Sequence, residues 1–126
     1  MKVLNGKVAL VTGGSRGIGA ASARHLASAG ANIAITYSAS ADAAAELVKE
    51  FETLGIKARA YLADASAPQS LPQVVERITA DLGSIDILVN NAGTFSVGMI
   101  GTVDEAEYRR IMTINVDSIF TMTQAV

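Results

Sequence analysis

A glycine-rich segment near the amino terminus has the residue types and spacing to bind a phosphate group. Residues 12–19 read TGGSRGIG and follow an apolar run. A tight turn needs residues that tolerate positive φ, and a backbone without side chains lets a phosphate approach closely. The free amides and the positive dipole end of a following helix would then bind the anion. The alternative is an ordinary glycine-rich turn.

Three further polar positions could hold functional side chains. Asp64 follows a predicted strand, the pair Asn90–Asn91 follows another, and Asn115 stands alone in an apolar segment. Buried amides are costly unless they are hydrogen-bonded, so the asparagines need partners. Each position also has a plainer interpretation: a turn or helix-capping aspartate, an Asn-Ala-Gly turn, and a mildly exposed polar residue on an amphipathic helix.

The composition excludes several classes of chemistry. The chain has 126 residues, no cysteine, one histidine and a formal net charge of −2. Disulfides, thiolate zinc sites and cysteine nucleophiles are therefore ruled out, and no metal site is predicted. The sequence pI of 5.3 leaves no basic footprint for nucleic acid. No apolar run reaches the ~18 residues of a membrane helix, and the first residues lack a signal-peptide pattern. We expect a cytoplasmic protein that acts on a small molecule.

Strand-like and helix-like segments alternate along the chain. Four short β-branched runs predict strands at residues 7–12, 32–37, 56–62 and 85–89, and apolar periodicity predicts helices at 17–29, 41–54, 70–82 and 104–126. Gly30, Gly55 and Gly83 occupy positions typical of glycine at helix carboxyl ends. Residues 102–105, TVDE, match a capping box that would begin the last helix.

This alternation predicts the fold class. Strands separated by helices form βαβ units, a parallel sheet and helices on both faces. We expect a doubly wound, Rossmann-type α/β sheet of about four strands, in one domain that covers residues 1–126. Ligands bind such sheets beyond the carboxyl ends of the strands. The glycine segment, Asp64 and the Asn90–Asn91 pair all follow predicted strands, so the functional site is expected at that edge.

The glycine spacing points to one family. The arrangement T-G-x-x-x-G-x-G at residues 12–19 differs from the generic G-x-G-x-x-G fingerprint. It resembles the glycine motif of the short-chain dehydrogenase/reductase family. Asp64, the segment NNAG at 90–93 and Asn115 follow in the family's order, and the resemblance extends from Lys7 to Val126. The segments GGSRGIG and NNAG are most similar to those of 3-oxoacyl-[acyl-carrier-protein] reductases.

The resemblance implies a role for each matched residue. The glycine segment would bind a dinucleotide through Gly13, Gly14, Ser15, Arg16, Gly17, Ile18 and Gly19. The carboxylate of Asp64 would accept a hydrogen bond from the adenine amino group, with help from the Ala65 backbone. Asn91, Ala92 and Gly93 would line the cofactor. Asn115 is the catalytic position, where the family's asparagine distorts its helix and anchors a proton-relay water.

The loop after the second predicted strand favours NADP(H) over NAD(H). A carboxylate about 20 residues beyond the glycine segment would bind the ribose 2′-hydroxyl of NAD and repel a 2′-phosphate. Residues 37–40 read YSAS, and the first acid is Asp42. Arg16 could hold a 2′-phosphate bidentately and Ser38 could add a hydroxyl donor. Alternatively, Arg16 is a solvated surface residue.

The family's proton donor does not occur in this chain. In the family a tyrosine and a lysine four residues later, helped by a serine, do the acid chemistry. Here Tyr37, Tyr61 and Tyr108 are followed at that spacing by Ala41, Ala65 and Met112. We therefore expect the amino-terminal half of an NADPH-dependent oxidoreductase that reduces a carbonyl, with a 3-oxoacyl group as one candidate, truncated before the catalytic Tyr-Lys segment. The alternative is a non-catalytic dinucleotide-binding module that serves as a regulator or scaffold.

The chain alone is expected to bind cofactor weakly and to have no turnover. The partners expected for a full-length enzyme are a small-molecule carbonyl, alcohol or acyl substrate and further copies of itself, with neither nucleic acid nor membrane. The segment 104–126 resembles the helix used for dimer and tetramer contacts in the family. Its apolar residues Ile111, Ile119, Phe120 and Met122 could serve that role or belong to the core.

Overall fold

The computed structural model describes residues 2–126. The strands are β1 (Val8–Val11), β2 (Asn32–Tyr37), β3 (Ala58–Leu62) and β4 (Ile87–Val89). The helices are α1 (Gly17–Ser28), α2 (Ala41–Glu52), α3 (Leu71–Leu82), α4 (Glu105–Met112) and α5 (Ser118–Ala125). A 3-10 turn, η1 (Pro68–Ser70), precedes α3, and a π-helical segment, η2 (Thr113–Asp117), joins α4 to α5.

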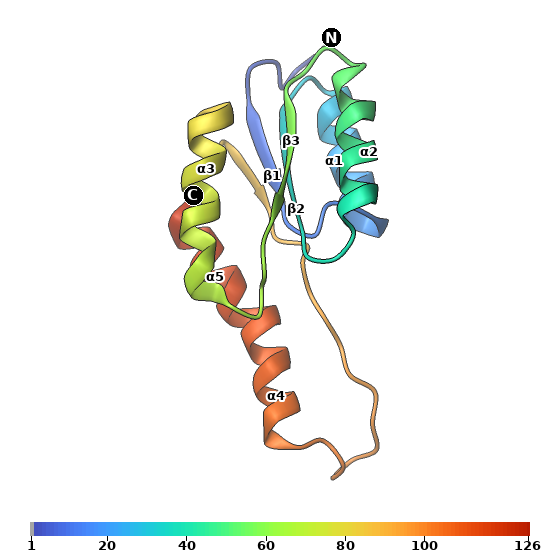
Figure 1. The fold of residues 1–126 in the computed structure, drawn as a ribbon, viewed down its shortest axis with the longest axis vertical. Helices are drawn as coiled ribbons and strands as arrows, with labels where there is room; N and C mark the ends of the chain where they lie inside the picture. The colour runs from blue at the N-terminus through green and yellow to red at the C-terminus, as the bar shows by residue number, and fades with distance from the viewer. Residues whose placement is uncertain (1) are drawn as a thin grey trace.

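The strands form one parallel sheet in the order β3-β2-β1-β4 (Figure 1). This arrangement confirms the predicted doubly wound fold. Val11 pairs with Ile35 of β2 on one side and with Val89 of β4 on the other. The residues that follow these three positions therefore leave the sheet side by side at one edge.

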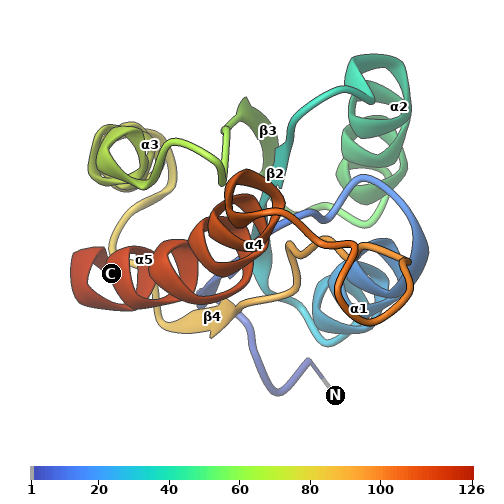
Figure 2. The ribbon, with the colours of Figure 1, turned by 90° about the horizontal axis from the view of Figure 1, so that it is seen from below.

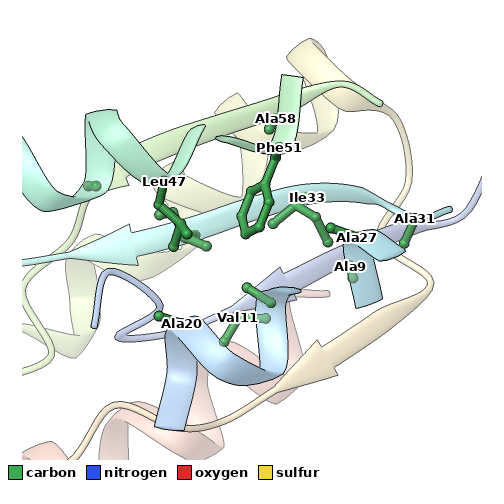
Figure 3. Packing of buried hydrophobic residues seen from close by; sticks show 12 residues of the cluster. Ala9, Val11, Ala20, Ala27, Ala31, Ile33, Leu47, Phe51 and Ala58 are labelled. Atoms are coloured by element: carbon green, nitrogen blue, oxygen red, sulfur yellow. The ribbon is translucent and has the colours of Figure 1, made fainter. Parts of the chain in front are cut away.

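Helices cover both faces of the sheet: α1 and α2 lie on one face, α3 and α5 on the other (Figure 2). The strands alternate accordingly, since Ala9 and Val11 of β1 face the first helix pair whereas Leu10 faces the second. Figure 3 shows the fully buried Phe51 ring of α2 packed over the sheet. Removing such a ring typically costs about 3–5 kcal/mol of folding free energy.

Three strands are shorter than predicted, since β1 covers Val8–Val11 rather than residues 7–12, and β3 and β4 both begin later than predicted. β3 begins at Ala58 rather than at residue 56, and β4 begins at Ile87 rather than at residue 85. At the starts of β3 and β4 a side chain supplies one hydrogen bond beside the last backbone bond, which runs from the Ile33 amide to the Lys57 carbonyl and from the Asp86 amide to the Val8 carbonyl. The amide of Lys57 donates to Oδ1 of Asn32 at 2.9 Å, and the amide of Val8 donates to Oδ2 of Asp86 at 2.9 Å.

The helix predicted over residues 104–126 begins at the predicted place but is divided into α4, η2 and α5, and the capping box predicted at residues 102–105 is wrong. The N-cap is Asp104, whose Oδ1 accepts a hydrogen bond from the amide of Glu107 at 2.8 Å. Thr102 donates instead to the Met99 carbonyl, which closes the preceding turn. Helix α4 and the loop before it extend away from the sheet (Figure 1).

Residues 2–126 carry neither a membrane-spanning helix nor a cluster of metal-ligating side chains. None of the described helices combines the length and apolar character needed to cross a membrane. Among the same residues, histidine and carboxylate side chains form no group of three or more that could hold a metal ion.

Candidate functional site

Three loops meet beyond the carboxyl ends of β1, β2 and β4 and enclose a cleft of about 370 Å³. The glycine segment contributes one wall, the loop after β2 a second, and residues 91–93 after β4 a third. The lining residues are Gly13, Ser15, Arg16, Gly17, Ile18, Tyr37, Ser38, Ala39, Ser40, Asn91, Ala92 and Gly93. Most of the predicted cofactor-binding residues are thus brought together.

A second cleft of about 240 Å³ continues the first toward β3. The two share Gly13, Tyr37, Ser38 and Gly93, so they form one continuous depression, the carboxyl-edge groove. The second cleft adds the predicted residues Asp64 and Ala65. Of the predicted residues, Gly14, Gly19 and Asn115 do not line the groove.

The glycines of the turn permit close backbone contacts. Gly13 has φ +61°, and a Cβ there would lie 3.1 Å from Cα of Ala92. A Cβ on Gly14 would lie 2.6 Å from Cγ2 of Ile35, and one on Gly19 would overlap the carbonyl oxygen of Gly13. Gly14 and Gly19 therefore allow the turn to pack closely against Ile35 and the Gly13 backbone, and they do not line the groove.

The amino terminus of α1 points toward an open part of the groove. Arg16 is its N-cap residue, with an extended backbone and no side-chain cap, and the first turn holds no acidic residue. Arg16 and Ile18 are exposed, and both line the cleft. Uncapped amides, a positive dipole end and a guanidinium make this end of the groove suited to an anion.

Asn91 joins the glycine turn to the end of β4. Its Nδ2 donates to the carbonyl oxygens of Thr12 and Gly13, each at 3.1 Å. In return, Oγ1 of Thr12 accepts hydrogen bonds from the amides of Asn91 and Ala92, each at 3.0 Å. The predicted need of Asn91 for partners is met, and the two walls of the cleft are fixed to each other.

Asp64 closes a turn, which is the plainer of its two predicted interpretations. Its Oδ1 accepts hydrogen bonds from the amide and the hydroxyl of Ser66, at 2.9 and 2.5 Å, which closes a turn. These bonds lower the pKa of the Asp64 carboxyl below its ordinary value. The carboxylate is exposed and borders the second cleft, so it can also accept a hydrogen bond from a ligand.

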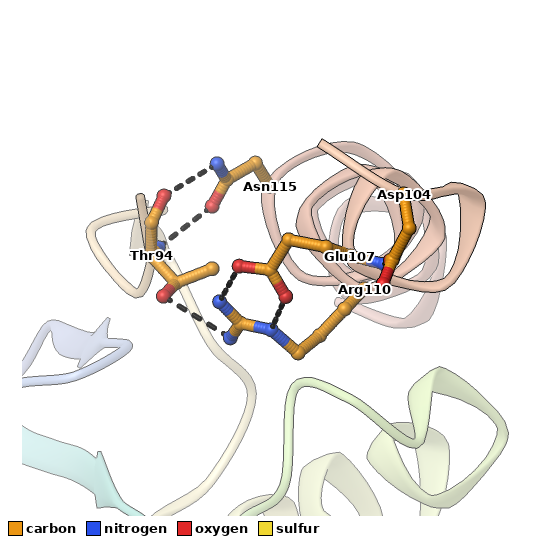
Figure 4. A network of polar contacts seen from close by, with 5 residues as sticks. All are labelled: Thr94, Asp104, Glu107, Arg110 and Asn115. Carbon is orange, nitrogen blue, oxygen red and sulfur yellow. Dashed lines mark hydrogen bonds and ion pairs between the residues drawn. The ribbon is translucent and has the colours of Figure 1, made fainter. Parts of the chain in front are cut away.

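Asn115 lies in the π-helical segment η2, which confirms the expected distortion of its helix. Its Oδ1 accepts from the amide of Thr94 at 2.8 Å and its Nδ2 donates to the carbonyl of Thr94 at 2.7 Å (Figure 4). Oδ1 also lies 3.2 Å from where a Cβ on Gly93 would stand. The side chain thus holds the backbone of Thr94, which lines the second cleft of the groove.

An ion pair that was not predicted from the sequence also contacts Thr94. Arg110 donates to both carboxylate oxygens of Glu107, at 2.8 and 2.9 Å, and to Oγ1 of Thr94 at 3.3 Å (Figure 4). The Arg110 hydrogen bonds, with a smaller contribution from Ser96, lower the pKa of Glu107 to about 2. The spacing of Glu107 and Arg110 along a helix is a sequence signal for such a pair, but its contact with Thr94 is not.

Thr36 is a second residue that the sequence analysis missed. Its Oγ1 accepts the amide of Gly13 at 3.1 Å, and its side chain is almost wholly buried. A threonine near the end of an apolar strand is ordinary in sequence, because β-branched residues favour strands. Only the register of β1 against β2 shows what it contacts.

The parallel sheet, the glycine turn at the start of α1 and the groove along the strand ends define a Rossmann-type α/β domain. The sequence model of the family described as short chain dehydrogenase matches residues 7–126. The chain therefore belongs to that family.

Named relatives agree with this assignment. The chain is 42% identical over 125 residues to an uncharacterized oxidoreductase of Methylorubrum extorquens, covering 99% of this chain and 50% of that protein. It is 34% identical over 120 residues to a 3-oxoacyl-[acyl-carrier-protein] reductase of Staphylococcus epidermidis, covering 95% of this chain and 49% of the relative. The chain thus spans about half the length of the curated relatives it matches.

Solved structures agree in fold as well as in sequence. A blue fluorescent protein from a metagenomic library, crystallised in complex with NADPH, superimposes with a TM-score of 0.94 at 50% identity. The match covers 98% of this chain and 51% of the other. At 50% identity the two chains are related in sequence as well as in fold.

Proposed function

We propose that this chain is the cofactor-binding half of an NADP(H)-dependent oxidoreductase that reduces a carbonyl to an alcohol. The observation that carries the proposal is the anion-binding end of the carboxyl-edge groove. There, Arg16 and the uncapped start of α1 face a cleft whose lining residues include no acid. The likeness to a protein crystallised with NADPH supports the same cofactor.

The residues present fit a dinucleotide. The glycine turn leaves room for a pyrophosphate beside α1, since neither Gly13 nor Gly17 places a side chain there. Arg16 and Ser38 would hold a 2′-phosphate, Asp64 and Ala65 would bind the adenine, and residues 91–93 would line the nicotinamide end. When bound, NADPH supplies the hydride for carbonyl reduction.

The tyrosines of this chain are not suited to donate the proton. Tyr61 is buried and donates its hydroxyl to Asp81 at 2.8 Å, and this burial together with the bond raises its pKa. None of the three tyrosines has a lysine four residues later. A catalytic Tyr-Lys segment would therefore have to lie outside residues 1–126. The second candidate function, a non-catalytic dinucleotide-binding module, rests on the same observation.

A 3-oxoacyl group is the narrower substrate that we propose. It rests on the resemblance of GGSRGIG and NNAG to the 3-oxoacyl reductases and on the 34% identity to the staphylococcal enzyme of that name. We further propose a cytoplasmic homo-oligomer for the full-length enzyme, with contacts through the exposed Ile119 and Phe120 of α5. Native mass spectrometry of the wild type and of F120S would test the oligomer.

Titration of the 126-residue chain with NADPH and with NADH tests the proposed cofactor. Nicotinamide fluorescence should show saturable, weak binding, tighter for NADPH. Binding of neither nucleotide, or tighter binding of NADH, would contradict the proposal. The same samples mixed with a 3-oxoacyl thioester should show no NADPH oxidation, and a measured rate would show that the chain supplies its own proton donor.

A further inference from the structure

Thr36 holds two consecutive amides of the glycine turn. Its Oγ1 accepts the Gly13 amide at 3.1 Å, and its carbonyl oxygen accepts the Gly14 amide at 3.0 Å. The residue is 4% exposed and borders the second cleft of the groove beside Gly13. One residue of β2 thus sets how the chain leaves β1.

The hydroxyl supplies an acceptor at the point where the sheet ladder ends. β1 pairs with β2 up to Val11 and Ile35. Gly13, with φ +61°, has turned out of the strand, and its amide bonds to a side-chain oxygen. Without that oxygen the partly buried Gly13 amide would lose its partner, and the lost hydrogen bond would leave the turn less firmly held.

The amides near the glycine turn fall into two groups, one bonded within the fold and one at the start of α1. Gly13 and Gly14 donate to Thr36 and are therefore committed to the fold. The amides at the start of α1, which has no side-chain cap, lie beyond the turn that these bonds fix. We infer that Thr36 is a positioning residue for dinucleotide binding: its hydroxyl orients the glycine turn so that the start of α1 faces the pyrophosphate. This inference rests on the proposed function.

The test compares ligands with and without a pyrophosphate. Thr36→Val keeps the branched shape and removes the hydroxyl, whereas Thr36→Ser keeps the hydroxyl. Thr79→Val is the matched control, since Thr79 of α3 bonds only within its own helix, to the Val75 carbonyl, and lines no part of the groove. Each protein is titrated with NADPH and with adenosine 2′-monophosphate, and its melting temperature is measured.

We expect T36V to lower NADPH affinity about tenfold and to lower adenosine 2′-monophosphate affinity much less, since that ligand lacks the pyrophosphate and would contact the turn through Arg16 alone. T36S and T79V should bind both ligands as the wild type does. Equal loss of both ligands in T36V, no loss of NADPH affinity, or failure of T36S to restore it would each overturn the inference. If T36V does not fold, T36A makes the same comparison.

Amide hydrogen exchange measures, without any ligand, how well the bonds to Thr36 protect the amides of the glycine turn. In T36V, exchange at Gly13 should become faster while Gly14, bonded to the Thr36 carbonyl, keeps its protection. Unchanged exchange at Gly13 would overturn the inference. A wild-type chain that binds neither nucleotide would refute the proposed function and the ligand role together, and the exchange result would still decide whether Thr36 holds the turn.

Discussion

The side-chain amide of Asn115 bonds at both of its ends to the backbone of Thr94, at 2.8 and 2.7 Å. Asn115 lies in the π-helical segment η2, and Thr94 directly follows the groove residue Gly93. The distorted helix and the end of β4 are thus connected through one side chain. In this structure Asn115 acts as a positioning residue for the wall of the groove.

Replacing Asn115 by alanine should destabilise the protein. The Thr94 amide and carbonyl would both lose their partners, so we expect N115A to reduce the free energy of unfolding by about 1–3 kcal/mol in urea titrations. N90A is the matched control, because the exposed Asn90 makes one longer side-chain bond, to Thr123 at 3.2 Å. Equal losses in the two variants would contradict this role for Asn115.

A side chain at Gly19 should disrupt the groove more than a side chain at Gly98, and both glycines have an ordinary φ. A Cβ there would overlap the Gly13 carbonyl and lie 2.5 Å from Nδ2 of Asn91, and the backbone atom cannot give way cheaply. We expect G19A to lower NADPH affinity more than tenfold and to lower the melting temperature. G98A, whose Cβ would meet only the Thr102 and Val103 side chains, should do neither. Wild-type NADPH affinity in G19A would show that the turn relaxes.

Much of the fold could be predicted because each element has a local pattern. The alternation of strands and helices and the glycines after α1 and α2 depend only on neighbouring residues. The start of α4 shows the limit. Two overlapping patterns, Thr102 with Glu105 and Asp104 with Glu107, both match a helix amino terminus. The structure places the N-cap at Asp104, and local sequence could not choose between them.

The functional site likewise has one part that the sequence could predict and one part that it could not. The glycine spacing and the NNAG segment are contiguous motifs, so sequence could locate them. The contacts of Thr36 with Gly13 and of Arg110 with Thr94 join residues that are distant along the chain. They depend on the strand register and on the distortion at η2, which no local pattern specifies.

The Glu107–Arg110 pair should make stability depend on pH in the acid range. The hydrogen bonds from Arg110 lower the folded-state pKa of Glu107 from its ordinary 4.5 to about 2. Its stabilising contribution is therefore fully present above pH 4.5 and is lost as pH falls toward 2. We expect E107Q to flatten the fall of melting temperature across that window. E105Q, which alters the exposed pair with Arg109 on the same helix, is the control. An unchanged pH profile in E107Q would contradict the assignment.

Arg16 should decide between the two nicotinamide cofactors. It is exposed and, with Ser38, lines a cleft whose lining residues include no acid, so its guanidinium is available to a 2′-phosphate. We expect R16A to lower NADPH affinity about tenfold and to leave NADH affinity within about twofold, because NADH lacks that phosphate. R24A is the matched control, since Arg24 is held by Glu50 at 2.8 and 2.9 Å and does not line the groove. Equal weakening of both cofactors by R16A would mean that Arg16 supports the glycine turn rather than contacting the 2′-phosphate.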